Sequence, residues 1–383
     1  MKKTYIDTAM ERIAPDLILK GGNVVDVFSG RVIKADVIIK DGIICGVGSY
    51  SGENEQDVSG KYIMPGFIDS HVHIESSMTQ PSEYAKAVMP HGITTVIADP
   101  HEITNVCGED GLEFMLKSAK NIPLDVNLML PSCVPATPFE HTGANLDAKT
   151  TQKLASKFFG IGEMMNYPGI VSGDDETLGK LCLDIIDGHA PLLSGHELDA
   201  YASAGIKTDH ECSVIEEMDE KISKGMYILL REGTLSLDVA KLIKGVTPYT
   251  LRRCAFCTDD RFVGEIIRDG SIDHCIRKAV SLGLNNIDAI IMATLNACEI
   301  YGMKNKGAIA PSYVADIVVA DDLNLSSISQ VYKNGKLVCE NGKALFECET
   351  VDNSKVTNTV HLPKISADFF KTDVKDKFDA IEL

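Results

Sequence analysis

The middle of the chain repeats a single pattern, in which a short apolar run is followed by a stretch with helical periodicity. Eight strand candidates of this kind fall at residues 67–69, 94–98, 126–129, 159–162, 185–187, 206–208, 227–230 and 254–257. Eight strand–helix units within about 240 residues match the size of a (β/α)₈ barrel. An open doubly wound sheet is the alternative, but no glycine-rich phosphate fingerprint follows the first strand candidate. The sequence therefore predicts an α/β fold with a TIM-like barrel over residues 65–304.

The N-terminal flank of this region has a different texture. The first sixty residues contain short β-rich runs at 16–20, 23–27 and 36–40. Asp41-Gly42 lies between two such runs and indicates a hairpin, because this dipeptide favours a two-residue turn. We expect residues 1–64 to form one part of a small β-sandwich.

The same texture returns after the barrel. Residues 315–319 are a strand candidate, and Asn334-Gly335 and Asn341-Gly342 mark two further tight turns. Residues 305–350 should therefore complete the sandwich, so that both ends of the chain build it. Residues 351–383 are polar and weakly patterned, and we expect either a tail, helical or disordered, or the start of a truncated C-terminal domain.

Charge and composition exclude several classes of partner. The formal net charge is −18, and a surface this acidic repels a phosphate backbone, so nucleic acid is not expected as a partner. No apolar run is long enough to span a bilayer, and the N-terminus has no secretory signal pattern. The 11 cysteines are an odd number scattered through a long chain, which is typical of buried thiols in a reducing compartment. We expect a cytoplasmic protein without a membrane partner.

Metal-binding side chains follow several of the barrel strand candidates. His71 and His73 end the first one, and residues i and i+2 of a strand point to the same side, so both imidazoles could grip one ion. The C-terminal ends of barrel strands meet at one mouth, and the later candidates add Glu163, His189, His210 and Asp259 there. Four imidazoles and two carboxylates suit divalent ions such as Mn²⁺, Fe²⁺ or Zn²⁺. A carboxylate can bridge two cations, so Glu163 could hold a pair.

These residues lie in motifs that resemble a known family. PGFIDSHVH at 65–73 is similar to the first-strand signature of the amidohydrolase superfamily of metal-dependent hydrolases. The segments most similar to its adenine deaminase branch are IESSM at 74–78, ADPHEI at 98–103, DGHAP at 187–191, TDHEC at 208–212 and CTDDR at 257–261. The resemblance covers most of residues 15–350 in order. Members of that branch usually continue beyond the point where this sequence stops.

The resemblance implies a site and a reaction. It implies a binuclear metal centre, with Mn²⁺ as the first expectation and Fe²⁺ or Zn²⁺ as alternatives. It implies a homo-oligomer that hydrolyses adenine to hypoxanthine and ammonia with a metal-activated hydroxide. The ligands implied are His71, His73, Glu163, His189, His210 and Asp259.

Proton transfer needs additional groups. Asp259 beside the metal is the candidate that takes a proton from water and passes it to the departing amine. His101, Glu102 and Glu75 are candidates for protonating the purine ring at N1, and the sequence does not choose among them.

Two alternatives stay open at this stage. Other amidohydrolases that act on cyclic amides or amidines share the first-strand signature. Many of their binuclear members use a carbamylated lysine as the bridge, whereas Glu163 ends the fourth strand candidate here. An inactive, truncated homologue is the non-enzymatic alternative, although all six implied ligands are present.

Overall fold

The structure is a computed structural model that describes residues 2–137 and 139–371. Parallel strands occupy its centre, each near a position where the sequence predicts one. In chain order they are β6 (Phe67–Val72), β7 (Ile93–Ala98), β8 (Asp125–Leu130), β9 (Gly160–Met164), β10 (Ile186–Gly188), β11 (Thr208–Asp209), β12 (Tyr227–Arg231) and β13 (Cys254–Cys257). Most of their positions are buried, and the apolar residues among them form the short runs that mark the strands in the sequence.

These strands curl into the predicted barrel. Ladders join β10-β9-β8-β7-β6 into one sheet and β11-β12-β13 into another within the described residues. A bridge between Val72 and Asp259 connects the first strand to the end of the last one. On the other side, the Lys207 amide donates to the Ile186 carbonyl at 3.4 Å, which brings β10 beside β11. The fold class expected from the sequence is confirmed.

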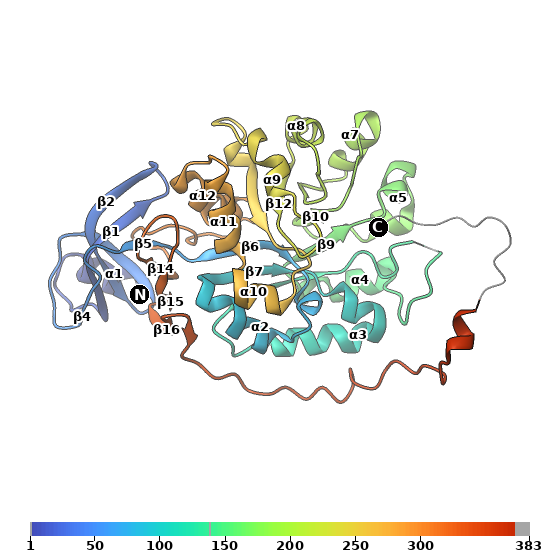
Figure 1. Ribbon diagram of the computed structural model, residues 1–383, viewed down its shortest axis with the longest axis horizontal. Helices are drawn as coiled ribbons and strands as arrows, with labels where there is room; N and C mark the ends of the chain where they lie inside the picture. The colour runs from blue at the N-terminus through green and yellow to red at the C-terminus, as the bar shows by residue number, and fades with distance from the viewer. Residues whose placement is uncertain (1, 138, 372–383) are drawn as a thin grey trace.

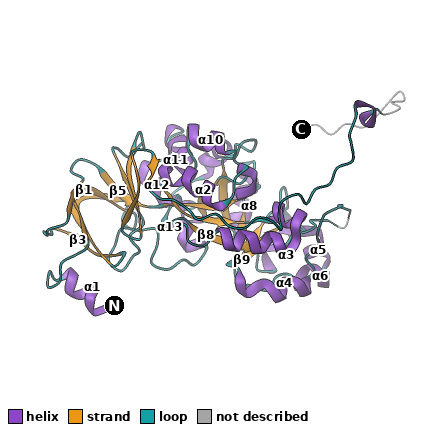
Figure 2. Cartoon of the chain, turned by 90° about the horizontal axis from the view of Figure 1, so that it is seen from below, coloured by secondary structure: helices purple, strands orange, loops and turns teal. Residues whose placement is uncertain are grey.

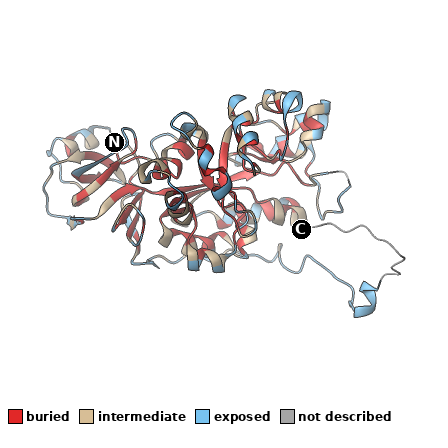
Figure 3. Ribbon diagram, turned by 45° about the horizontal axis from the view of Figure 1, so that its top comes forward, coloured by how far each residue is buried: buried red, intermediate tan, exposed pale blue. Residues whose placement is uncertain are grey.

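Helices cover the outside of the barrel (Figure 1). They are α2 (Pro81–Val88), α3 (His101–Ser118), α4 (Ala148–Leu154), α5 (Tyr167–Ser172), α6 (Asp175–Gly179), α7 (Gly195–Ser203), α8 (Ile215–Ser223), α9 (Val239–Leu242), α10 (Val263–Asp269), α11 (Ile272–Ser281), α12 (Asn286–Met292) and α13 (Leu295–Ile300). Figure 3 shows buried strands at the centre and exposed outer faces on the helices. Strand ends and the loops after them are therefore left free to build one mouth.

A sheet outside the barrel, which we call the second sheet, lies to one side of it and combines strands from both ends of the chain (Figure 2). Its order is β17-β16-β15-β14-β5-β1-β2-β3, with β4 paired to β1. The N-terminal strands are β1 (Leu17–Asp26), β2 (Arg31–Lys40), β3 (Ile43–Gly48), β4 (Glu55–Asp57) and β5 (Tyr62–Pro65). The C-terminal strands are β14 (Ile317–Ala320), β15 (Ile328–Lys333), β16 (Lys336–Glu340) and β17 (Lys343–Ala344). The domain boundaries expected at 64/65, 304/305 and 350/351 stay a prediction.

The hairpins of this sheet form where the sequence indicates them. Asp41-Gly42 joins β2 to β3, Asn334-Gly335 joins β15 to β16, and Asn341-Gly342 joins β16 to β17. Both residues of each pair have positive φ, between 48° and 76°. Asparagine, aspartate and glycine tolerate this left-handed conformation, and the resulting turn matches the twist of paired strands.

A compact ionic cluster ties the second sheet to the barrel. Lys333 on β15 contacts Asp125 at the start of β8 and Asp316 just before β14, both at 2.7 Å. Lys306 reaches the same two carboxylates, with Asp316 at 2.8 Å. Lys333 and Asp316 are buried, so their attraction is screened little by solvent, whereas the Asp125 side chain is 40% exposed.

Two segments differ from the β-rich texture or were left open by the sequence. Lys2–Ala9 forms helix α1, an element that the expected sandwich part at residues 1–64 did not include, and Tyr5 packs against Ile18 and Ile38. Residues 345–371 run as irregular chain past α2 and α3, apart from a single turn at Ala367–Phe370 (Figure 1). Residues 372–383, part of the predicted tail, lie outside the described residues. No helix in the described ranges is long and apolar enough to cross a membrane.

Candidate metal centre

The two histidines of the first barrel strand converge with a carboxylate from the last one. His71 Nε2 and His73 Nε2 lie 3.1 Å apart, and both rings are buried. Asp259 Oδ1 lies 3.5 Å from His71 Nε2 and 3.2 Å from His73 Nε2. Two imidazole nitrogens at this distance would repel through their lone pairs unless a proton or a cation lies between them. The three side chains could therefore hold one cation together.

Glu163, at the end of β9, links this group to a second one. Its Oε1 lies 3.4 Å from His73 Nε2. Its Oε2 lies 2.6 Å from His189 Nδ1 and 3.1 Å from His210 Nε2. Each carboxylate oxygen thus faces a different set of imidazoles, which is the arrangement that a bridge between two cations requires. The structure brings all six sequence-predicted ligand residues to one end of the barrel.

Neighbouring groups fix how the first-strand imidazoles present their nitrogens. His73 Nδ1 lies 2.8 Å from the Asp99 carbonyl, so it carries the proton and leaves Nε2 free to bind. His71 Nδ1 faces Asp187 Oδ2 at 3.5 Å. The Tyr301 hydroxyl donates to the Ser70 carbonyl at 2.6 Å, and its oxygen lies 3.0 and 3.2 Å from the two oxygens of Asp187. These contacts orient both rings toward the mouth.

Asp259 reaches the centre from a left-handed backbone position. Its φ is 56°, in the region that aspartate tolerates better than most residues, and backbone contacts hold it there. Those contacts are backbone hydrogen bonds from the Asp259 amide to the His71 carbonyl and from the His73 amide to the Asp259 carbonyl, at 3.0 and 3.1 Å. Arg231 Nη1 donates to Asp259 Oδ2 at 3.2 Å, which leaves Oδ1 facing the histidines.

The pKa values at the centre reflect its mixture of buried charges. Burial disfavours the protonated ring of His71, but contacts with Asp187 and Asp259 raise its pKa to about 10. Burial also disfavours the ionised carboxyl of Glu163, yet contacts with His101, His189 and His210 hold its pKa well below the usual range. Without a cation, protons on the imidazoles balance the carboxylates. A divalent cation would supply the same positive charge, so the donor set fits one.

The three sequence candidates for ring protonation lie beside this centre. His101 and Glu102 begin α3, and His101 Nε2 lies 3.4 Å from Glu102 Oε1. Glu75 lies in the turn Ile74–Ser77, where its Oε1 accepts the Ile103 amide at 3.3 Å. Burial, together with the charge of Glu102, raises the pKa of Glu75 to about 8. Glu75 Oε2 and Glu102 Oε2 are buried without a hydrogen-bond partner among the described residues.

Residues 62–338 match the model of the amidohydrolase family, which is most of the chain. The chain belongs to the amidohydrolase family. Members of this family are metal-dependent enzymes, and the described residues contain several groups of His, Cys, Asp and Glu that could hold a metal ion.

Similar amidohydrolases include curated bacterial proteins. The chain is 50% identical over 369 residues to a protein of Clostridium acetobutylicum named adenine deaminase, covering 94% of this chain and 65% of that relative. It is 48% identical to a protein of Desulfotalea psychrophila named adenine deaminase 2, covering 97% of this chain and 66% of that relative. The chain thus spans slightly less than two thirds of the length of these relatives.

Solved structures with a similar fold include other amidohydrolases. An enamidase superposes with a TM-score of 0.65 at 19% identity, covering 87% of this chain and 97% of the enamidase. A β-aspartyl dipeptidase of Fervidobacterium islandicum gives a TM-score of 0.62 at 20% identity, covering 88% of this chain and 99% of the dipeptidase. At this level of identity the likeness establishes the fold alone.

Sequence reasoning missed two residues that the amidohydrolase barrel also brings to its mouth. Cys133 follows β8, and Arg231 ends β12. Both satisfy the rule that selected the other candidates, namely a position at the C-terminal end of a barrel strand. Asp187 begins the DGHAP segment at 187–191, but its contact with His71 spans 116 residues of sequence, and no local pattern encodes that contact. His196 is fully exposed on α7 and takes no part in the centre.

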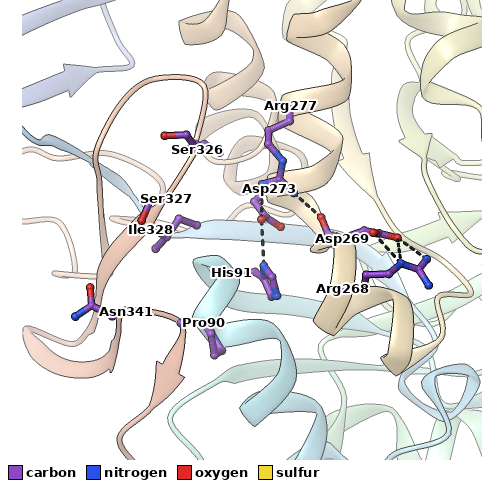
Figure 4. Close-up of a pocket in the computed structure, with 12 residues that line it drawn as sticks. Pro90, His91, Arg268, Asp269, Asp273, Arg277, Ser326, Ser327, Ile328 and Asn341 are labelled. Atoms are coloured by element: carbon purple, nitrogen blue, oxygen red, sulfur yellow. Dashed lines mark hydrogen bonds and ion pairs between the residues drawn. The ribbon is translucent and has the colours of Figure 1, made fainter.

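A pocket elsewhere on this amidohydrolase has no comparable chemistry (Figure 4). It has a volume of about 450 Å³ and is lined by His91, Asp273 and residues of the loops around β15 and β16. Arg277 is paired with Asp273 at 2.7 Å, and Arg268 with Asp269 at 2.6 Å. Because neighbouring carboxylates neutralise both guanidinium groups, the pocket offers no excess positive charge to an anion.

Proposed function

We propose that this chain forms the catalytic barrel of an adenine deaminase, which hydrolyses adenine to hypoxanthine and ammonia. The observation that carries the proposal is the convergence of four imidazoles and two carboxylates at the mouth of an amidohydrolase barrel. The names of relatives that are 43–50% identical support the choice of substrate. A cytoplasmic location and self-association stay predictions.

The proposed centre holds two divalent cations, with Mn²⁺ preferred over Fe²⁺ and Zn²⁺. His71, His73 and Asp259 would hold one cation, His189 and His210 the other, and Glu163 would bridge them. A bound cation of this kind lowers the pKa of a water molecule toward neutrality. The second-sphere contacts of His71 and His73 serve to keep the ligand nitrogens pointing inward.

Asp259 is proposed to move the proton between water and the departing amine. Burial would raise its pKa, but contacts with His71 and His73 hold the pKa well below the usual range, so its carboxylate is ionised. An ionised carboxylate is the form that accepts a proton. Arg231 fixes one of its oxygens, which leaves the other directed at the reacting centre.

Glu75 is the favoured proton donor for N1 of the purine. Its pKa of about 8 keeps it protonated at neutral pH, whereas contacts with His73 and His101 lower the pKa of Glu102 against the effect of burial. A neutral acid with an unpartnered oxygen can donate to a ring nitrogen as negative charge develops there. Glu102 and His101 are then proposed to orient the ring.

An apolar wall beside the mouth could hold the flat base. A cavity of about 320 Å³ lies next to Asp260 and Ser76 and is lined by Met78, Leu235 and Phe262. Purines stack on aromatic and apolar side chains, and the volume lies within the range of small-molecule pockets.

The decisive experiment is an ammonia-release assay on purified protein reconstituted with Mn²⁺. Adenine, adenosine and AMP are compared under one condition, and adenine is expected to be the preferred substrate. Faster turnover of either ribosylated compound would contradict the free-base assignment. No ammonia release from any of the three by fully loaded protein would favour another amidohydrolase reaction or an inactive homologue.

Matched variants test the assigned residues. His71→Ala and Glu163→Gln should lower the bound metal, and unchanged content in both would refute the ligand set. Asp259→Asn should reduce turnover by about 10²–10⁴-fold without rescue by excess Mn²⁺. Asp260→Asn is the control for register, since Asp260 lies outside the ligand set, is exposed at the rim and bonds Ser76. Because Asp260 also borders the cavity assigned to the base, this variant is expected to change the KM for adenine while keeping kcat. Activity retained by Asp259→Asn and lost by Asp260→Asn would mean that the register is wrong.

A further inference from the structure

A thiol lies against the proposed centre from a strand end that the ligand set does not use. Cys133 follows β8, and its side chain is 2% exposed. One ligand atom each from Asp99, His101, Cys133 and Glu163 lie within 4.8 Å of one another. We refer to these four residues as the Cys133 corner. Three of them come from the ends of neighbouring strands β7, β8 and β9, and His101 begins the helix after β7.

Polar atoms in the Cys133 corner lack the partners that buried groups normally have. Asp99 is completely buried, and its Oδ1 has no hydrogen-bond partner among the described residues. His101 Nδ1 is in the same condition, although it lies 3.2 Å from Glu163 Oε1 and 3.8 Å from Asp99 Oδ2. Buried polar atoms are hydrogen-bonded in the great majority of cases. Unsatisfied donor and acceptor atoms gathered around a thiol indicate a missing ligand.

The backbone is shaped to admit the Asp99 carboxylate. Gly162 precedes Glu163 on β9, and a Cβ at this position would lie 2.2 Å from Asp99 Oδ2. The same oxygen accepts the Glu163 amide at 3.0 Å, so the carboxylate is fixed on one side and free on the other. The absence of a side chain at Gly162 therefore keeps Asp99 within reach of the corner.

The donor chemistry of the corner differs from that of the proposed centre. Imidazole and carboxylate ligands serve Mn²⁺ and Fe²⁺, whereas a cysteine thiolate is a soft ligand that favours Zn²⁺ and related thiophilic ions. We propose that the Cys133 corner is a separate cation site that takes one thiophilic divalent ion, Zn²⁺ in the cell, through Cys133, His101 and Asp99. An ion there would also draw on Glu163 Oε1, which is one half of the proposed bridge.

This sharing has a functional consequence that rests on the proposed function. A Zn²⁺ ion in the corner would take His101 away from the substrate and weaken the bridge made by Glu163. Zinc added to Mn²⁺-loaded protein should therefore inhibit deamination, and the inhibition should depend on Cys133.

The test uses Cd²⁺ as a probe, because its bond to a thiolate gives an ultraviolet charge-transfer absorption. Mn²⁺-loaded protein is titrated with Cd²⁺, and Cys133→Ser is compared with Cys339→Ser. Cys339 is a matched control, since it is equally buried but lies on β16 in the second sheet. Wild type and Cys339→Ser should gain a saturable absorption at one equivalent of Cd²⁺, and Cys133→Ser should lack it. Circular dichroism and Mn²⁺ content verify that each variant is folded, and Cys133→Ala serves as a second variant.

Each outcome decides the matter. The same one-equivalent absorption in Cys133→Ser, or its absence in wild type, would overturn the site. Displacement of Mn²⁺ by Cd²⁺ without thiolate absorption would also overturn it. If the absorption depends on Cys133 but neither the wild-type protein nor any variant releases ammonia from adenine, the cation site stands and the proposed function fails.

Discussion

Replacing Lys221 with methionine should destabilise the barrel and loosen the metal centre together. Its side chain is fully buried on α8, and its ammonium donates to Asp209 Oδ2 at 2.9 Å, Glu217 Oε1 at 2.8 Å and the Ala190 carbonyl at 2.7 Å. All three ammonium donors are thus used. Burial would lower the pKa of Lys221, but the charge of Asp209 raises it, so the group stays charged.

The magnitude follows from what methionine leaves behind. Asp209 is completely buried, and removal of one partner of a buried ion pair typically costs about 3–5 kcal/mol. Three backbone amides still bond to Asp209, from Ala190, Glu211 and Cys212 at 2.9–3.1 Å. These bonds stabilise the remaining anion, so we expect the lower end of the range, about 3 kcal/mol.

Lys224→Met is the matched control, because Lys224 lies three residues further on, at the C-terminal end of α8. Lys224 contacts Asp199 at 2.7 Å, but both side chains are substantially exposed. An exposed pair contributes about 0–1 kcal/mol. The assay is urea unfolding of the metal-free protein followed by circular dichroism, because the chain has no tryptophan to report fluorescence.

A metal measurement accompanies the unfolding curve. Asp209 directly precedes His210 and bonds the amide next to His189, so the loosened carboxylate should lower Mn²⁺ retention in Lys221→Met alone. A free-energy difference below 1 kcal/mol between the two variants, with equal Mn²⁺ content, would refute this reasoning.

Three further changes give independent tests. Gly162→Ala should cost about 1–3 kcal/mol in urea unfolding because its Cβ meets the Asp99 carboxylate, whereas Gly264→Ala on α10, where nothing lies within 4 Å, should cost nothing. Glu75 has a pKa raised from 4.5 to about 8, so it stays protonated when the unfolded chain ionises, and wild type loses stability as pH rises from 5 to 8. The melting temperature of Glu75→Gln should therefore gain on that of wild type over this range, and a constant difference would contradict it. Since the pKa of His71 is about 10 without metal, Mn²⁺ must displace its proton, and Mn²⁺ affinity measured by calorimetry should rise from pH 6 to 8.

Local sequence patterns predicted most of the fold because its elements are locally consistent. Barrel strands such as Cys254–Cys257, β13, are buried on both faces, so their apolar runs are uninterrupted. Tight turns such as Asn334-Gly335 need positive φ, which few residue types adopt readily, so the residue types themselves mark the turn in the sequence. Helix α1 was missed because its residues are mostly polar, and its one apolar anchor, Tyr5, packs on strands that are distant in sequence.

The candidate site was predictable in its members and less so in its connections. A position at the end of a barrel strand selects His71, Glu163 and Asp259, and the same rule also selects Cys133 and Arg231. The contacts that set proton positions could not be predicted, because they join elements far apart in the chain. The contact between His73 Nδ1 and the Asp99 carbonyl, for example, depends on how closely the ends of β6 and β7 approach each other.

The position of β5 in the second sheet has a consequence for synthesis on the ribosome. β5 pairs with β1 on one side and with β14 on the other, yet β14 leaves the ribosome only after the whole barrel has been made. At typical elongation rates that interval is on the order of tens of seconds. During it the apolar edge of Tyr62–Pro65 is open to pairing with another nascent chain. Chaperone binding to ribosome-bound chains should therefore peak on this edge and end once residues 317–320 emerge.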